Sequence, residues 1–175
     1  NYNIIASAGA NGSISPSGTT TLSCDGTGDQ TYTITPNACY SVADVLVDGV
    51  SVGAVTTYTF TDVTTNHTIA ASFVLNTYNI VASSGANGSV TPTGTTSVNC
   101  GDNLTYTITP DACYAIADVL VDGVSVGAVG SYSFNNVSAG HTISASFSLI
   151  SYTITASAGT GGSISPSGSV SADCG

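Results

Sequence analysis

Two copies of a G-x-S-x-G pattern, at Gly49–Gly53 and Gly123–Gly127, are the first candidates for chemistry in this sequence. The pattern is typical of hydrolases in which the serine is a nucleophile on a sharp turn between a strand and a helix. Ser51 instead follows a predicted hairpin tip and precedes the strand-like TTYTF, and His67 stands in a polar turn. We therefore interpret Ser51 as an outward-facing strand residue and predict that the chain is not an enzyme and has no catalytic residue.

Five cysteines are the next candidates. Zinc ligation is disfavoured, because the spacing is not C-x₂-C and no histidine falls nearby. We predict the disulfides Cys24–Cys39 and Cys100–Cys113, each between neighbouring strands of one repeat, and a bridge over about 15 residues contributes roughly 3 kcal/mol. Cys174 corresponds to Cys24, so we expect its partner in the sequence that follows. Disulfides indicate an oxidising, extracytoplasmic setting.

Histidine and aspartate supply the remaining candidates. His67 and His141 each precede the last predicted strand of a repeat, and we interpret them as turn residues, with a pH switch or a metal ligand as the alternative. Asp25 and Asp29 flank two glycines and form a weak Ca²⁺ candidate, because they offer fewer than the six to eight oxygens that this ion prefers. We predict no metal and no cofactor.

Five N-x-[ST] sequons could accept glycans if the chain is secreted. They are Asn11, Asn66, Asn87, Asn103 and Asn136. In a sequence rich in Ser, Thr and Asn such triplets also arise by chance, so their occupancy is left open.

The charge of the chain limits its partners. All ten acidic residues are Asp, and the absence of Lys and Arg leaves a formal charge of −10. Nucleic acids are excluded, because phosphate binding depends on basic side chains, and anionic membrane surfaces are disfavoured for the same reason. No apolar run approaches the roughly 20 residues of a membrane span. Without Lys, Lys–Asn isopeptide crosslinks cannot form.

Internal repeats organise the chain. The segment YNIIASAGANGSISPSG that starts at Tyr2 returns in closely similar form from Tyr78 and again from Tyr152. We predict repeat 1 at 1–76, repeat 2 at 77–150 and the N-terminal part of repeat 3 at 151–175. The natural protein is expected to continue after Gly175.

Within a repeat the hydrophobic period is two, which is typical of strands. In YNIIASA, the side chains of Tyr2, Ile4 and Ala6 share one face, and we predict that this face is buried. Ile5 is predicted to face solvent, because its position becomes Val81 and then Thr155 in the other copies. The buried set also includes Tyr32, Ile34, Ile69, Ala71, Phe73, Ile143, Ala145 and Phe147.

Turn residues separate these runs. Asn11–Gly12 and Asp48–Gly49 are predicted two-residue hairpin turns, and we expect six or seven short strands per repeat. The predicted fold is all-β, with tandem small β-sandwich or β-grasp-like repeats of about 74 residues, each with one intra-repeat disulfide. Leu75 and Leu149 lie in the short junctions and are predicted to pack between successive repeats, which gives a semi-rigid rod.

The unit resembles the divergent internalin B-repeat (Listeria–Bacteroides repeat) family of tandem repeats on bacterial and archaeal surface proteins. The resemblance is carried by TITP-x-A-x-Y, V-DG and the closing HTI-x-A-x-F, and it extends over essentially the whole chain. It implies a small β-rich, β-grasp-like spacer or adhesion module without catalytic residues. The chain departs from the pattern at its cysteines: Cys39 and Cys113 stand where Gly is expected, and Cys24 and Cys100 where an aromatic is common.

These observations predict a structural, non-catalytic segment of an extracellular fibre, filament or cell-surface adhesin stalk that provides length and stiffness. The alternative is a carbohydrate- or protein-binding surface module. Expected partners are adjacent repeats or identical subunits in a fibre, with other cell-surface components or glycans as further candidates. Whether the repeats lie in one long chain or in subunits that polymerise is left open.

Overall fold

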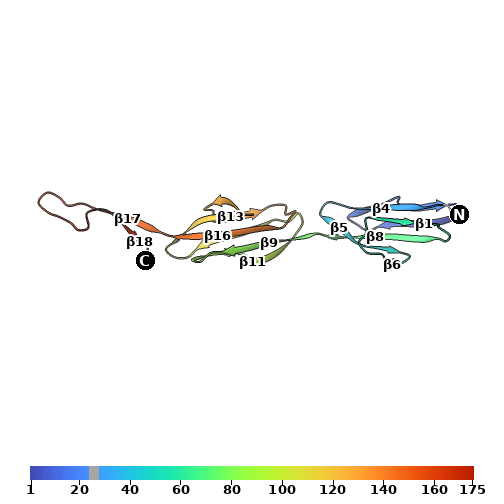
Figure 1. Ribbon diagram of the computed structural model, residues 1–175, viewed down its shortest axis with the longest axis horizontal. Helices are drawn as coiled ribbons and strands as arrows, with labels where there is room; N and C mark the ends of the chain where they lie inside the picture. Colours follow the sequence, from blue (N-terminus) through green and yellow to red (C-terminus); the bar gives the residue numbers. More distant parts are fainter. Residues whose placement is uncertain (24–27) are drawn as a thin grey trace. The chain divides into compact units, whose positions relative to one another are not determined.

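Every regular element among the described residues, 1–23 and 28–175, is a β-strand, which confirms the all-β prediction. In the computed structural model the chain divides into two units, Asn1–Asn76 and Thr77–Gly175 (Figure 1). No helix in these residues is long and apolar enough to cross a membrane. The two units are described separately below.

The described residues of unit 1 form eight strands, one or two more than the sequence predicts. They are β1 (Tyr2–Ala8), β2 (Gly12–Ser15), β3 (Gly18–Leu22), β4 (Gln30–Pro36), β5 (Tyr40–Val47), β6 (Val50–Ser51), β7 (Thr57–Phe60) and β8 (His67–Leu75). A five-stranded sheet has the order β3-β1-β8-β5-β6, and a three-stranded sheet has the order β2-β4-β7. All pairs are antiparallel except β1 with β8, which are parallel.

Unit 2 repeats this arrangement and adds a hairpin. Its strands are β9 (Thr77–Ser84), β10 (Gly88–Thr91), β11 (Gly94–Asn99), β12 (Leu104–Pro110), β13 (Tyr114–Val121), β14 (Val124–Gly127), β15 (Ser131–Phe134), β16 (His141–Leu149), β17 (Ser151–Ala156) and β18 (Gly168–Asp173). The sheets have the orders β11-β9-β16-β13-β14 and β10-β12-β15, and β17 pairs with β18 alone.

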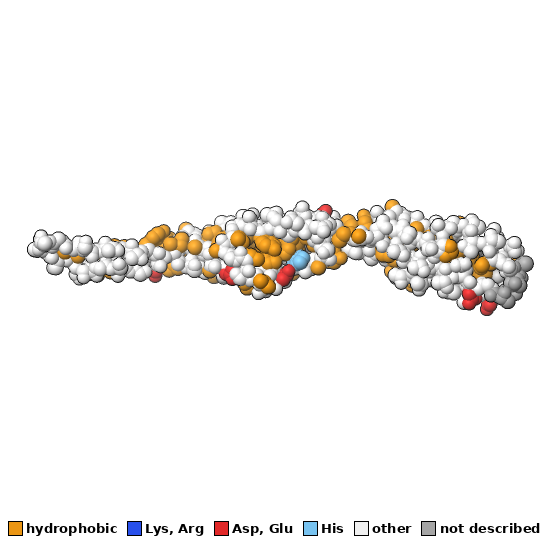
Figure 2. All heavy atoms as spheres, turned by 90° about the horizontal axis from the view of Figure 1, so that it is seen from above, with side chains coloured by type: hydrophobic (Ala, Val, Ile, Leu, Met, Phe, Trp, Pro, Cys, Tyr) orange, Lys and Arg blue, Asp and Glu red, His pale blue; other side chains and the backbone are white. Residues whose placement is uncertain are grey.

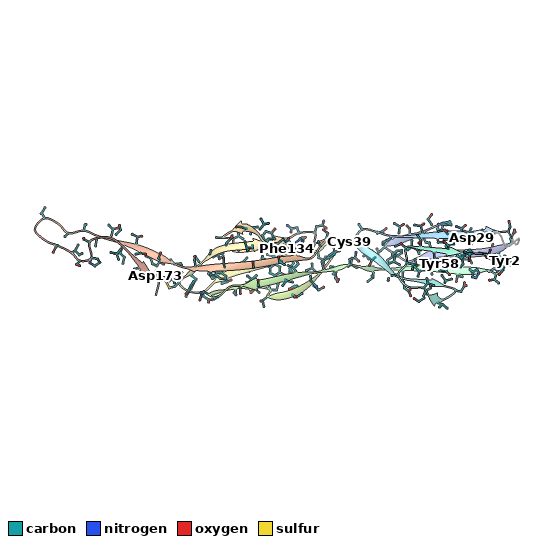
Figure 3. The ribbon with its side chains drawn as sticks, viewed as in Figure 1. Tyr2, Asp29, Cys39, Tyr58, Phe134 and Asp173 are labelled. Atoms are coloured by element: carbon teal, nitrogen blue, oxygen red, sulfur yellow. A yellow bond between two sulfur atoms is a disulfide. The ribbon has the colours of Figure 1, made fainter. Side chains whose placement is uncertain are left out.

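The core of each repeat lies where the period of two predicts it. Ile4 and Ala6 are buried, whereas Ile5 between them is 52% exposed. Tyr32 and Ile34 come from the three-stranded sheet and join the same cluster as Ile69 from the other sheet. Repeat 2 has an equivalent cluster, in which Phe134 lies edge-on to Tyr106. Figure 3 labels Phe134 in this repeat. Two sheets therefore enclose one core in each repeat.

A bulge in β5 shifts this alternation. The pairing with β8 slips between Val42 and Asp44, so Val42 and Val45 both face the core although they are three residues apart. Asp44 is left on the outer side. An extra residue in one strand of an antiparallel pair has this effect, and β13 has the same slip between Ile116 and Asp118.

One of the two predicted hairpin turns is correct. Asp48 and Gly49 both have positive φ and join β5 to β6, as a two-residue turn requires. The hairpin prediction for Asn11–Gly12 is wrong, because β1 pairs with β3 while β2 pairs with β4 in the other sheet. Asn11 does have positive φ, but its turn carries the chain between the sheets.

Gly12 has a packing role. A Cβ added to Gly12 would lie 2.2 Å from the ring of Phe73, and one added to Gly88 would lie 2.3 Å from the ring of Phe147. The glycine leaves room for an aromatic ring from the last strand of the repeat to lie against the backbone. This contact connects the two sheets in both repeats.

Candidate functional site

The clearest site of chemistry is a disulfide in unit 2. Cys113 and Cys174 are bonded, with a Cα–Cα distance of 5.2 Å and a sequence separation of 61 residues. Cys113 lies in the turn before β13, and Cys174 directly follows β18. The bond therefore joins repeat 2 to the first hairpin of repeat 3.

The backbone around this bond forms a clasp centred on Ile150. The N–H of Ile150 donates to the carbonyl of Cys113 at 2.8 Å, and the N–H of Cys174 donates to the carbonyl of Ile150 at 2.8 Å. Cys113 has a φ of 68° and is held by a turn in which Tyr114 N–H donates to the carbonyl of Asp111. Both cysteines are thus positioned from either side of one linker residue.

The predicted disulfide Cys100–Cys113 is wrong, because Cys113 is bonded to Cys174. The prediction assumed that bonded cysteines lie on neighbouring strands of one repeat. Cys113 instead lies in the turn before β13, at the end of that strand next to the junction with repeat 3. Its partner is therefore 61 residues away in the sequence. The prediction that Cys174 bonds beyond the sequence is wrong for the same reason. The predicted pair Cys24–Cys39 involves Cys24, which lies outside the described residues.

Ser51 contacts a carboxylate. Its Oγ donates to Oδ1 of Asp44 at 2.7 Å and accepts from the N–H of Gly53 at 3.3 Å. In repeat 2 Ser125 makes the same bond to Asp118 at 2.6 Å. Each serine therefore fixes a short hairpin, β5–β6 or β13–β14, to the bulged strand, which is a structural role.

His67 forms a contact that the sequence analysis missed. Its Nδ1 lies 2.6 Å from Oδ2 of Asp48 at the hairpin tip, and its ring lies against Phe60, with centroids 5.0 Å apart. His141 and Asp122 make the same contact at 2.7 Å in repeat 2. The pair connects the tip of one hairpin to the start of the last strand.

The same aspartates also accept backbone hydrogen bonds. Asp48 Oδ1 accepts from Thr68 N–H at 2.7 Å, and Asp122 Oδ1 accepts from Thr142 N–H at 2.8 Å. The hydrogen bond from His67, followed by that from Thr68, lowers the pKa of Asp48 below its ordinary value. For Asp122 the larger cause of the lowered pKa is the Thr142 N–H, followed by His141. Both interactions favour the ionised carboxylate.

Repeat 1 adds a hydroxyl on the far side of the histidine ring. Thr65 Oγ1 lies 3.2 Å from Nε2 of His67, so hydroxyl, imidazole and carboxylate follow one another as in acyl-transfer sites. Repeat 2 has Ala139 at the position of Thr65 and keeps the Asp–His pair. The feature common to both repeats is therefore the pair that holds the hairpin.

All five sequon asparagines are exposed. Two of them use their side-chain oxygen as an acceptor: Asn66 accepts from Asn3 N–H at 2.8 Å, and Asn103 accepts from Asn136 N–H at 2.7 Å. Glycosylation of these positions stays a prediction.

The structure describes one of the two aspartates of the calcium candidate. Asp25 lies outside the described residues, and Asp29 accepts from the N–H of Asp62 at 3.4 Å. Within the part of the chain that the structure describes, no group of three or more His, Cys, Asp or Glu side chains could hold a metal ion, and no pocket is present. One face of the molecule shows mostly uncharged side chains with a few acidic ones (Figure 2).

The two junction leucines differ from each other. Leu149 is 43% exposed, which contradicts the burial expected from its predicted packing between repeats. Leu75 is half-buried and lies opposite Tyr40 in the β5–β8 pair, and its packing between repeats stays a prediction.

Comparison with protein families places one repeat in a known class. Residues 78–151 match the family model of the divergent InlB B-repeat domain. The resemblance identified from the sequence is therefore confirmed, and repeat 2 belongs to this family of surface-protein repeats. No curated protein and no solved structure matches the chain significantly.

Proposed function

We propose that this chain is a structural, non-catalytic segment of an extracellular fibre, filament or cell-surface adhesin stalk, in which repeats add length and stiffness. The observation that carries the proposal is the disulfide from Cys113 of one repeat to Cys174 of the next, across a linker held by hydrogen bonds. A covalent tie between successive domains restricts their relative motion, which is the property a spacer needs.

Two further observations support this function. Repeats 1 and 2 have the same strand orders and share most of their core positions, so the chain places one domain type in succession. Repeat 2 belongs to a family of surface-protein repeats, and disulfides are maintained in oxidising compartments. We accordingly assign the segment to the cell surface or the extracellular space. Its partners are adjacent repeats or identical subunits.

The test is the dependence of particle length on repeat number. Chains with two, four and six complete repeats should give a maximum dimension that increases linearly in small-angle X-ray scattering, because each repeat contributes a fixed length. Negative-stain images should show the same increments. A maximum dimension that grows with the cube root of mass, as in one intermixed globule, would contradict the proposal. Glycan-array binding that is independent of repeat number would favour the alternative, a carbohydrate-binding module.

A further inference from the structure

We propose that Thr65 of repeat 1 is an acyl-acceptor site, at which the hydroxyl takes an acyl group from an activated ester or thioester and becomes an ester. Thr65 is exposed in the loop between β7 and β8, and its Oγ1 lies 3.2 Å from Nε2 of His67. The inference does not depend on the proposed function, because a stalk and a binding module could both carry a modified threonine.

The carboxylate of Asp48 sets the direction of the hydrogen bonds at this site. Its Oδ2 lies 2.6 Å from Nδ1 of His67, and its Oδ1 accepts from Thr68 N–H at 2.7 Å. The hydrogen bonds from His67 and Thr68 hold the pKa of Asp48 below its ordinary value, so the carboxylate is ionised at neutral pH and can only accept. Nδ1 of neutral His67 therefore carries the hydrogen atom, and Nε2 accepts from the hydroxyl of Thr65.

The imidazole ring of His67 is also fixed by packing. It lies against Phe60, with ring centroids 5.0 Å apart, and Phe60 is buried in the core of repeat 1. The side chain of His67 is still 25% exposed, so a small acyl donor can reach Thr65 and His67 from solvent. A ring that is held by a carboxylate and presents its free nitrogen to a hydroxyl is the arrangement that activates hydroxyl nucleophiles.

The step that this arrangement supports is acyl transfer to oxygen. Oγ1 of Thr65 attacks the carbonyl carbon of the donor while the hydroxyl proton passes to Nε2 of His67. The bond from that carbon to the leaving oxygen or sulfur then breaks, and the proton passes from His67 to the leaving group. The products are an ester at Thr65 and the alcohol or thiol of the donor, and no group is oxidised or reduced.

Repeat 2 separates this role from a structural one. It keeps the pair, with Nδ1 of His141 2.7 Å from Oδ2 of Asp122, and the ring of His141 lies 4.9 Å from that of Phe134. Its loop has Ala139 where repeat 1 has Thr65. The pair therefore holds the hairpin of repeat 2 without a hydroxyl, so the hydroxyl of Thr65 is not required for that contact.

Reaction of the whole chain with p-nitrophenyl acetate tests the site. The chain has no lysine to compete for the acetyl group. After reduction of the disulfides, cleavage before Asp separates peptide 62–101, which contains Thr65 and His67, from peptide 122–172, which contains Ala139 and His141. Tandem mass spectrometry should find the acetyl group on Thr65. The other hydroxyls of peptide 62–101 should react at least about 100-fold more slowly, since they lack the general base.

Two matched variants remove and add the hydroxyl. Thr65→Ala should abolish acetylation of peptide 62–101, and the fold tolerates this change because repeat 2 has alanine at the equivalent position. Ala139→Thr should give peptide 122–172 an acetyl group that the unmodified chain does not acquire there. His67→Gln should lower the rate at Thr65 by about 100-fold or more, because it removes the general base.

Asp48 acts through His67 and is a positioning residue. Asp48→Asn should lower the acetylation rate, and the nitrogen NMR shifts of His67 should show that the hydrogen atom no longer lies mainly on Nδ1. A lower rate without a change in these shifts would contradict the positioning role.

Three results would overturn the proposal. The first is acetyl on His67 or on the amine of Asn1 with none on Thr65, because the nucleophile would then be a nitrogen atom. The second is an unchanged yield in peptide 62–101 from Thr65→Ala, and the third is no acetyl gained by Ala139→Thr. The length measurement under Proposed function does not depend on acylation, so failure of one proposal is distinguishable from failure of the other.

Discussion

The first hairpin of repeat 2, β9 with β11, and the hairpin β17–β18 have related sequences and different environments. Ile80 in β9 is fully buried, whereas Ile154 at the same place in β17 is 57% exposed. Val90 is buried, and its counterpart Ile164 is 45% exposed and belongs to no strand. The strand register is nevertheless the same in both. Pairing of the first hairpin is thus encoded locally, while its burial depends on strands that come later in the repeat.

The largest expected effect is on the free energy of unfolding, and it should differ between alanine substitutions at two equivalent isoleucines. Ile80→Ala should lower the free energy of unfolding of repeat 2 by about 2–5 kcal/mol, because it leaves a cavity in the core. Ile154→Ala should change it by less than about 0.5 kcal/mol. Urea denaturation followed by tyrosine fluorescence measures both. Equal losses would show that the hairpin has a core of its own.

A glycine pair sharpens the same comparison. Gly88→Ala should cost about 1–3 kcal/mol, because the added Cβ would fall 2.3 Å from the ring of Phe147 and displace it. Gly162→Ala is the control, since no atom lies within 4 Å of the Cβ built there. Thermal unfolding of the two variants should rank them clearly. If Gly88→Ala left the free energy of unfolding unchanged, the Phe147 ring would be able to move aside without loss of packing.

The buried tyrosine of repeat 2 is expected to have an effect of opposite sign. Tyr106 is fully buried, and its hydroxyl makes no hydrogen bond. Tyr106→Phe should therefore raise the free energy of unfolding by about 1 kcal/mol. A loss of stability on this substitution, measured by urea denaturation, would reveal a hydrogen-bond partner for the hydroxyl.

The smallest expected effect is a loss of folding stability at low pH. The pKa of Asp48 and that of Asp122 are lowered in the folded chain, so their contribution to stability is present above the unfolded-state pKa near 3.9. It is lost as the pH falls through the lowered folded-state value. The urea midpoint of the unmodified chain should therefore fall more between pH 6 and pH 3 than that of the Asp48→Asn, Asp122→Asn double variant. Parallel decreases would contradict this role.

The sequence predicts the parts of the fold that depend on local alternation. Ile4, Ile34 and Ile69 face the core as predicted, and Ile5 faces solvent, because a period of two assigns faces without knowledge of partners. The assignment of Asn11–Gly12 to a hairpin failed, since the residues of a turn do not specify which strands pair. A turn of this kind suits a crossover between sheets equally well.

The candidate site was harder to predict, since its partners are distant in sequence. The Cys113–Cys174 bond spans 61 residues and two repeats, whereas the prediction chose the nearest cysteine. The Asp48–His67 contact spans 19 residues and was also missed. Both had a usable signal: the Asp-to-His spacing is identical in the two repeats, as is the cysteine spacing from one repeat to the next.

The most direct test of this account is single-molecule extension of the Cys24→Ser, Cys39→Ser variant under oxidising and then reducing conditions. If Cys113 is bonded to Cys174, reduction should release the 61 residues that the bond spans and lengthen the fully extended chain by about 210 Å. A lengthening of only about 45 Å, the value for a bond between Cys100 and Cys113, would contradict it.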